Sequence, residues 1–256
     1  MSNKNILSAK GLKKYFTAPG GFFISKRPQI KAVDDVNIDV KYGETLGIVG
    51  ETGSGKTTLA KLLVGLYNPT AGRIYYEGKD TLIRKNIQMV FQDPYNSLDP
   101  KMKIYDTLKE GIIIHNIVPA LKIQQKLHEL LDMVQLSRAS LDRYPHEFSG
   151  GERQRIAIAR ALSTEPKLVI CDEPVSSLDV SIQGKILHLL LNLQKRLNLS
   201  YIFISHDILV VRAISDRIAV MHKGKIVEEG PGQQICESPS NSYTKELMSA
   251  ASYGKI

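Results

Sequence analysis

Cysteine is scarce in this chain of 256 residues, which contains only Cys171 and Cys236. Two cysteines so far apart offer no disulfide framework and no C-x-x-C spacing that would hold a metal. This scarcity is typical of a protein in a reducing, cytoplasmic setting. The first residues, MSNKN, also lack the apolar stretch of a secretory signal peptide, so we expect no such signal.

Long hydrophobic runs are missing as well. One of the longest apolar stretches, residues 108–123, is interrupted by Lys109, Glu110, His115 and Pro119. A membrane-spanning helix needs about 20 mostly apolar residues. We therefore expect that the chain does not cross a membrane and that it reaches any membrane it serves through a partner.

Acidic residues are absent from residues 1–31, although the whole chain carries a net charge of +8. A basic segment attracts anionic partners such as nucleotides, lipid headgroups or nucleic acid, but it is equally a common form of solvated surface. The charge alone does not decide between these interpretations. The basic residues of the segment are Lys4, Lys10, Lys13, Lys14, Lys26, Arg27 and Lys31.

Short apolar runs alternate with stretches of helical periodicity along most of the chain. Residues 45–49, 167–171 and 201–205 are predicted to be buried strands, and residues 56–65 and 182–197 are predicted to be helices. Strands that alternate with helices indicate an α/β fold around a mostly parallel sheet whose faces are covered.

Four further strands are predicted near the two ends of the chain. Residues 6–15 and 31–40 flank a loop rich in proline, glycine and aromatic residues, and residues 217–221 and 225–228 flank a hairpin turn at Lys223-Gly224. A closing helix is predicted over residues 243–251.

The middle of the chain differs from the rest because residues 93–155 are mostly helical in pattern, with few strand signals. We predict that this segment is an α-helical subdomain inserted into an α/β core of residues 1–92 and 156–256. Residues 1–256 then form a single domain.

Residues 50–57, GETGSGKT, fit the phosphate-binding P-loop pattern G-x-x-x-x-G-K-[ST], between a predicted strand and a predicted helix. The glycines let backbone N–H groups turn toward phosphate oxygens, and the helix adds its positive N-terminal end. Lys56 is predicted to neutralise phosphate charge, and Thr57 to place its hydroxyl on Mg²⁺. The predicted nucleotide-binding residues of this segment are Gly50, Glu51, Thr52, Gly53, Ser54, Gly55, Lys56, Thr57 and Thr58.

Two adjacent carboxylates, Asp172 and Glu173, follow the apolar run at residues 168–171. Ligands of open α/β sheets collect at the C-terminal ends of such strands, although adjacent carboxylates alone are equally compatible with a capped turn. Together with the P-loop, they predict that Asp172 holds Mg²⁺ and that Glu173 polarises the attacking water as a general base.

A second glycine-rich segment, residues 149–155 (SGGERQR), resembles the signature of ATP-binding-cassette (ABC) ATPases, as does ARAL at residues 159–162. Ser149 of this segment precedes Asp172 by 23 positions, which is the spacing that the family uses. The resemblance implies a RecA-like P-loop NTPase fold with an N-terminal antiparallel β portion. It also implies that two cassettes close over ATP, with Ser149, Gly150 and Gly151 of one binding the γ-phosphate held by the other. Glu152 stands where glutamine is common, and we expect its side chain to turn toward ribose or water.

The resemblance also implies roles for four residues outside these segments. Gln92 resembles the Q-loop glutamine that contacts Mg²⁺, Asp179 resembles the D-loop aspartate, and His206 resembles the H-loop histidine that contacts the γ-phosphate. Tyr15, rather than the adjacent Phe16, is expected to stack on adenine. The implied catalytic residues are Glu173, His206, Lys56 and Gln92, and the implied metal ligands are Thr57, Gln92 and Asp172.

Several segments are similar in particular to the ATPase subunits of bacterial oligopeptide, dipeptide and nickel permeases. They are residues 31–36 (KAVDDV), 90–100 (VFQDPYNSLDP), 172–181 (DEPVSSLDVS) and 238–247 (SPSNSYTKEL). The resemblance implies an ATP-hydrolysing subunit of an importer, using ATP and Mg²⁺ at the cytoplasmic face of the cell membrane. Its implied partners are a second ATPase subunit of the same or another kind, two transmembrane permease subunits and an extracellular solute-binding protein.

Three alternatives stay open at this point: an ATPase of a nickel or metallophore importer, an ABC ATPase of phosphonate metabolism, and one that acts on nucleic acid or the ribosome. The last is disfavoured because 91 positions separate Thr58 from Ser149, too few for the long coiled coil of the DNA-repair members. We therefore expect no nucleic-acid partner. No cysteine cluster is present, so no iron–sulfur site is expected. The sequence does not identify the transported solute.

Overall fold

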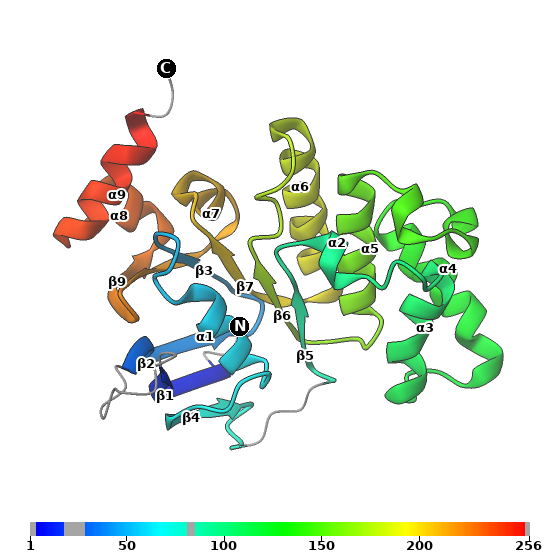
Figure 1. The fold of residues 1–256 in the computed structure, drawn as a ribbon, viewed down its shortest axis with the longest axis horizontal. Helices are drawn as coiled ribbons and strands as arrows, with labels where there is room; N and C mark the ends of the chain where they lie inside the picture. The colour runs from blue at the N-terminus through cyan, green and yellow to red at the C-terminus, as the bar shows by residue number, and fades with distance from the viewer. Residues whose placement is uncertain (1–3, 18–28, 81–84, 254–256) are drawn as a thin grey trace, which may run out of the picture. The chain divides into compact units, whose positions relative to one another are not determined.

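The computed structural model describes residues 4–17, 29–80 and 85–253. The chain forms two compact units, of which the first comprises Met1–Leu82 and Ile202–Ile256 and the second comprises Ile83–Tyr201 (Figure 1). The boundaries that we predict for a helical subdomain, at residues 93 and 155, stay a prediction. Residues 18–28, most of the loop that we predict between the strands at residues 6–15 and 31–40, lie outside the described residues.

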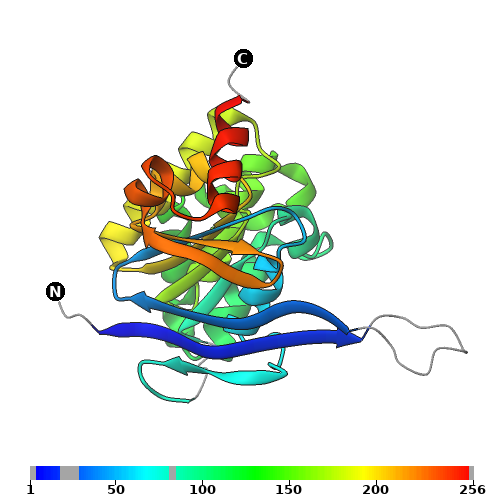
Figure 2. The same cartoon turned by 90° about the vertical axis from the view of Figure 1, so that its left-hand side faces the viewer.

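The first unit contains an antiparallel sheet in the strand order β2-β1-β4. Figure 2 shows these three strands side by side. Its strands are β1 (Asn5–Thr17), β2 (Gln29–Lys41) and β4 (Ala71–Tyr76). Buried apolar residues alternate with polar ones along β2, except at Asp35, where a positive φ of 62° and a register shift mark an irregularity. The N-terminal antiparallel portion that the family resemblance implied is therefore present.

Four more strands of the first unit follow one another in the order β7-β3-β8-β9. They are β3 (Thr45–Val49), β7 (Ser200–Ser205, which begins at the end of the second unit), β8 (Arg217–His222) and β9 (Lys225–Pro231). Strands β3 and β8 are parallel, and β8 turns back into β9 as an antiparallel hairpin. Lys223 and Gly224 form this turn with φ values of 46° and 82°, as the sequence predicted.

The helices of the first unit are α1 (Lys56–Leu63), α7 (Ile208–Ile214), α8 (Gly232–Glu237) and α9 (Ser242–Tyr253). Helix α1 begins directly behind the P-loop, and its Leu59, Ala60, Leu62 and Leu63 are buried. Strand β3, which leads directly into the P-loop, is buried along its whole length. The P-loop is therefore mounted on a fully packed strand and a helix.

The second unit holds a parallel strand pair and most of the helices. Strand β5 (Ile87–Val90) pairs with β6 (Leu168–Asp172), with Val90 opposite Cys171. The helices are α2 (Pro94–Ser97), α3 (Ile104–Ile114), α4 (Ile123–Met133), α5 (Gly150–Leu162) and α6 (Val180–Leu197), joined by short 3₁₀ turns at Ala120–Lys122, Arg138–Asp142 and Pro145–Glu147. These elements confirm the helical character predicted for the middle of the chain and the α/β class of the fold.

Within the described ranges, no helix combines the length and the apolar character that crossing a membrane requires.

Candidate functional site

The P-loop of the first unit joins β3 to α1 and is shaped by close backbone approaches. Gly55 precedes α1 with φ 110°, in the left-handed region, and a Cβ there would lie 2.1 Å from the carbonyl oxygen of Ala32. A Cβ on Gly50 would lie equally close to the carbonyl oxygen of Met221. Only glycine fits at both positions. The loop backbone is therefore pressed between β2 and the end of β8.

Lys56 lies inside this loop. Its side chain is 4% exposed, and its ammonium donates to the carbonyl oxygens of Gly50 and Glu51 at 2.6 and 2.8 Å. A buried cation at the N-terminus of a helix, surrounded by loop backbone, fits the polyphosphate of a nucleotide. Thr57 and Thr58 follow in the first turn of α1, where their side chains are half-buried.

Two contacts from the C-terminal part of the chain hold the P-loop from outside. The backbone N–H of Gly224, in the β8–β9 turn, donates to the carbonyl oxygen of Ser54 at 2.9 Å. The backbone N–H of Glu51 donates to the hydroxyl of Tyr243, in α9, at 3.1 Å. We did not foresee either contact, because no local spacing links residues so far apart in the sequence.

In the second unit, two parallel strands bring three of the predicted site residues to one edge. Asp172 ends the buried strand β6 and is 2% exposed, and Glu173 follows it with φ 47°. Gln92 comes two residues after Val90 of β5, and its side-chain amide donates to the carboxylate of Glu173 at 3.2 Å. A left-handed backbone at a non-glycine residue is strained, and such strain is concentrated at functional sites.

The signature segment of the second unit begins α5. The side chain of Ser149 caps the helix and accepts a hydrogen bond from the N–H of Glu152. The Glu152 carboxylate accepts in return from the backbone N–H and the hydroxyl of Ser149, at 2.9 and 2.8 Å. These two bonds, the backbone one first, hold the pKa of Glu152 below its ordinary value. Glu152 thus folds back onto Ser149 in a capping box, a contact that we did not foresee, and our expectation that its side chain turns toward ribose or water stays a prediction.

The signature glycines lie against the segment that contains Asp179. A Cβ on Gly150 would be 3.3 Å from the Leu178 side chain, and a Cβ on Gly151 would be 2.7 Å from that of Ile182. Asp179 itself caps α6: its carboxylate accepts from the Ser181 hydroxyl at 2.6 Å and from the Ile182 N–H at 3.0 Å, and these bonds lower its pKa. The predicted D-loop aspartate thus has a structural role as a helix cap.

The first turn of α5 is also tied to the segment after Gln92, through a residue that we did not single out. Arg153 is 5% exposed, and its guanidinium lies 3.6 Å from the ring centroid of Tyr95, in α2. Its Nε donates to the carbonyl oxygen of Pro145 at 2.7 Å, and burial lowers its pKa. The arginine therefore fixes the signature relative to α2.

The two remaining predicted residues lie in the first unit. His206 directly follows β7 and is exposed, and Asp207 caps α7 beside it. The hydroxyl of Tyr15 donates to Asp34 at 2.5 Å, and the Lys31 ammonium lies 5.4 Å from the Tyr15 ring. Phe16 packs edge-on against Tyr67 instead. The assignment of an adenine-stacking role to Tyr15 stays a prediction.

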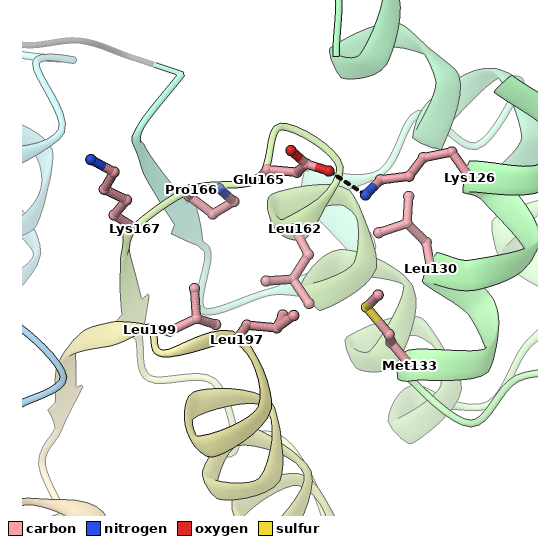
Figure 3. Close-up of a pocket in the computed structure, with 9 residues that line it drawn as sticks. All are labelled: Lys126, Leu130, Met133, Leu162, Glu165, Pro166, Lys167, Leu197 and Leu199. Atoms are coloured by element: carbon pink, nitrogen blue, oxygen red, sulfur yellow. Dashed lines mark hydrogen bonds and ion pairs between the residues drawn. The ribbon is translucent and has the colours of Figure 1, made fainter. Parts of the chain in front are cut away.

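The second unit also contains a pocket of about 270 Å³ that none of these residues lines. Figure 3 shows leucine side chains and Met133 around it, with an ion pair between Lys126 and Glu165 at 2.5 Å on one side. It lies between α4 and the ends of α5 and α6. The pocket is therefore separate from the predicted catalytic residues of its unit.

Comparison with known proteins identifies this arrangement. The family model described as ABC transporter matches residues 33–176. The chain is 45% identical to the oligopeptide transport ATP-binding protein OppF of Bacillus subtilis, over 96% of this chain and 82% of that protein. It is 46% identical to the dipeptide transport ATP-binding protein DppF of Haemophilus influenzae, over 97% and 78%.

Solved structures show the same fold. CbiO1 from Clostridium perfringens, part of the ABC transporter complex cbiONQ, superimposes with a TM-score of 0.78 at 28% identity, over 99% of this chain and all of that one. The ATP-binding cassette MJ0796, a dimer in a post-hydrolysis state bound to ADP and Pi, superimposes with a TM-score of 0.75 at 28% identity, over 88% and 98%.

Proposed function

This chain belongs to the ABC transporter family, and from that premise we propose that it is the ATP-hydrolysing subunit of an importer of oligopeptides or dipeptides. Its relatives over almost the whole chain are ATP-binding proteins of peptide transport, and a structural neighbour is bound to ADP and Pi. The observation that carries the proposal is the presence in one chain of a P-loop that buries Lys56 and a signature helix that begins at Ser149.

The nucleotide binds at the P-loop in this proposal. Lys56 neutralises charge on the phosphates, and the backbone N–H groups at the start of α1 donate to phosphate oxygens. We propose that Thr57, Gln92 and Asp172 hold Mg²⁺, because hydroxyl, amide and carboxylate oxygens are the ligands that this ion takes. The ion supplies charge neutralisation for the terminal phosphate when bound.

We propose that Glu173 is the general base for hydrolysis. Its carboxylate accepts the hydrogen bond from Gln92, which fixes its orientation, and its carbonyl oxygen accepts from the backbone N–H and the hydroxyl of Ser176 at 3.3 and 3.1 Å. The carboxylate takes a proton from the water that attacks the γ-phosphorus, and His206 donates to the γ-phosphate as negative charge builds there. Tyr15 is proposed to stack on adenine.

A second ATPase subunit completes the site in this proposal. Ser149, Gly150 and Gly151 begin a helix whose N-terminal N–H groups suit a γ-phosphate presented by a facing subunit. Glu152 and Asp179 secure the ends of the two helices at this surface. The dimer of a structural neighbour supports this arrangement.

The chain associates peripherally with the membrane through the transporter that it serves. We propose that it docks at the cytoplasmic face on two transmembrane permease subunits, which receive peptide from an extracellular solute-binding protein. Closure of the ATPase dimer on ATP and its reopening after hydrolysis would drive the permeases between their two states.

The experiment is copurification of the tagged chain from gently solubilised native membranes, with mass spectrometry of the bound proteins. Recovery of two multi-span permeases and a second ATPase supports the proposal. Recovery of nucleic acid or ribosomal proteins without a membrane protein would leave the ATPase assignment standing and refute the transport role.

A further inference from the structure

One peptide group of the P-loop has a hydrogen-bond partner at its carbonyl oxygen and another at its N–H. The carbonyl oxygen of Gly50 accepts from the Lys56 ammonium at 2.6 Å, and the N–H of the same peptide group, on Glu51, donates to the Tyr243 hydroxyl at 3.1 Å. A hydrogen bond at one end of a peptide polarises the group and strengthens the bond at the other end. Lys56 and Tyr243 are therefore linked through a single planar unit.

The ring of Tyr243 is held in place as well as its hydroxyl. Its ring lies against that of His222, with 3.9 Å between the ring centroids and 38° between the ring planes. His222 ends β8, the strand that runs parallel to β3 and so reaches the same edge as the start of the P-loop. Burial raises the pKa of the Tyr243 hydroxyl, so this group stays neutral and keeps its proton at physiological pH.

The start of α9 is also held by hydrogen bonds. The carboxylate of Glu228, in β9, accepts from the backbone N–H groups of Ser240 and Asn241 at 2.6 and 3.2 Å. The side-chain carbonyl of Asn241 then accepts from the N–H of Tyr243 at 2.9 Å. Figure 2 shows α9 rising beside β9 within the first unit. The hydroxyl of Tyr243 is thus presented to the P-loop by anchored backbone rather than by a free helix end.

We propose that Tyr243 is a positioning residue for the P-loop. Its hydroxyl holds the Gly50–Glu51 peptide in the orientation in which the Gly50 carbonyl places the Lys56 ammonium for phosphate. Tyr243 acts through that peptide and makes no contact with the nucleotide. The inference rests on the proposed function, in which Lys56 binds the phosphates of ATP.

The coupling has a consequence for the C-terminal helix. If the bond to Tyr243 favours the form of the loop that binds ATP, then ATP must favour the bond to the same degree, because linkage is reciprocal. Bound ATP therefore holds α9 more firmly against the first unit. The helix becomes an element whose stability responds to occupancy of the P-loop.

The test compares Tyr243→Phe with the wild type and with Tyr42→Phe. Both substitutions remove one tyrosine hydroxyl from the first unit. Tyr42 is a matched control because its hydroxyl donates to Glu77, and it is not among the residues that we place at the P-loop. Affinity of the purified chain for ATP is measured by isothermal titration calorimetry. The free energy of unfolding is measured in parallel by urea titration.

We expect Tyr243→Phe to weaken ATP binding roughly two- to tenfold, as the loss of one hydrogen bond predicts, and Tyr42→Phe to leave it unchanged. In the assembled transporter the apparent KM for ATP should rise by a similar factor, while kcat changes less. Wild-type affinity in Tyr243→Phe, or an equal loss in both variants, would overturn the inference. A wild type that binds ATP no better than Lys56→Ala would instead refute the proposed function.

Hydrogen exchange supplies a second readout that does not depend on affinity. Addition of ATP to the wild type should slow amide exchange in α9, and this protection should shrink in Tyr243→Phe. If ATP does not change the rate of amide exchange in α9 of the wild type, the reciprocal coupling is contradicted, whatever the binding constants are.

Discussion

The side-chain amide of Gln92 donates a hydrogen bond to the carboxylate of Glu173 across 3.2 Å. The two residues lie at corresponding positions beyond the paired strands β5 and β6, so the sheet itself sets their distance. The bond fixes the orientation of the proposed general base before nucleotide is bound. Catalytic groups that are oriented in advance need less reorganisation during the reaction.

Glu173→Gln tests the proposed base. The substitution keeps the size of the side chain but removes the group that accepts the proton, so hydrolysis should fall about 10²- to 10⁴-fold while ATP binding stays close to that of the wild type. Phosphate release by the assembled transporter and calorimetric binding by the isolated chain measure the two quantities. Hydrolysis at the wild-type rate in transporters where every ATPase subunit carries the substitution would refute the role.

Gln92→Glu tests the contact between the two residues. A carboxylate at position 92 cannot donate to Glu173, and its negative charge repels that of Glu173. We therefore expect ATP hydrolysis to fall further in Gln92→Glu than in Gln92→Ala, which removes the hydrogen bond without adding a charge. Phosphate release by the assembled transporter measures both rates. Equal rates in the two variants would show that the two side chains are apart in the working enzyme.

Glu152→Gln tests the charge in the capping box. The amide oxygen of glutamine still accepts from Ser149, but the favourable charge at the N-terminus of α5 is lost, and we expect a destabilisation of about 0.3–1 kcal/mol at neutral pH. The pKa of Glu152 is lowered in the folded chain. Its contribution is therefore present above the unfolded pKa and disappears as the pH falls through the lower, folded value.

Urea unfolding of the wild type and of Glu152→Gln, at neutral pH and at successively lower pH, measures this difference. The two stability curves should converge in acid. A difference that does not depend on pH would mean that the Glu152 charge makes no contribution. Glu152→Ala, which removes the acceptor as well, should cost more than Glu152→Gln at neutral pH.

Gly55→Ala tests the shape of the P-loop. The new Cβ would lie 2.1 Å from the Ala32 carbonyl oxygen at a φ of 110°, so the loop must move. We expect a loss of about 1–3 kcal/mol in stability and a marked loss of ATP affinity. Gly53→Ala is the matched control, because its φ is also positive but a Cβ there meets nothing within 4 Å. Equal affinities in the two variants would contradict the argument from close approach.

Much of the fold follows from local sequence. The buried strand before the P-loop, the helix behind it and the hairpin at Lys223-Gly224 are all encoded by residues that are neighbours in the chain. The same holds for the start of α5, where Ser149 and Glu152 stand three positions apart, although the local pattern did not lead us to the direction of the Glu152 side chain.

The contacts that assemble the site were not predictable in this way. The bond between Glu51 and Tyr243 spans 192 positions, and that between Gln92 and Glu173 spans 81. Such pairs depend on the order of strands in a sheet and on where a distant helix begins. A periodic pattern reports which face of an element is buried, and it carries no information about which polar group will meet which.

Peptide uptake tests the central claim most directly. Cells that lack this chain would be given a radiolabelled tripeptide, with the wild-type chain or Glu173→Gln restored. The account predicts that the wild type restores energy-dependent uptake and that Glu173→Gln, present in equal amount at the membrane, does not. Uptake that is unaffected by the loss of the chain and of any ATPase paired with it would contradict the account.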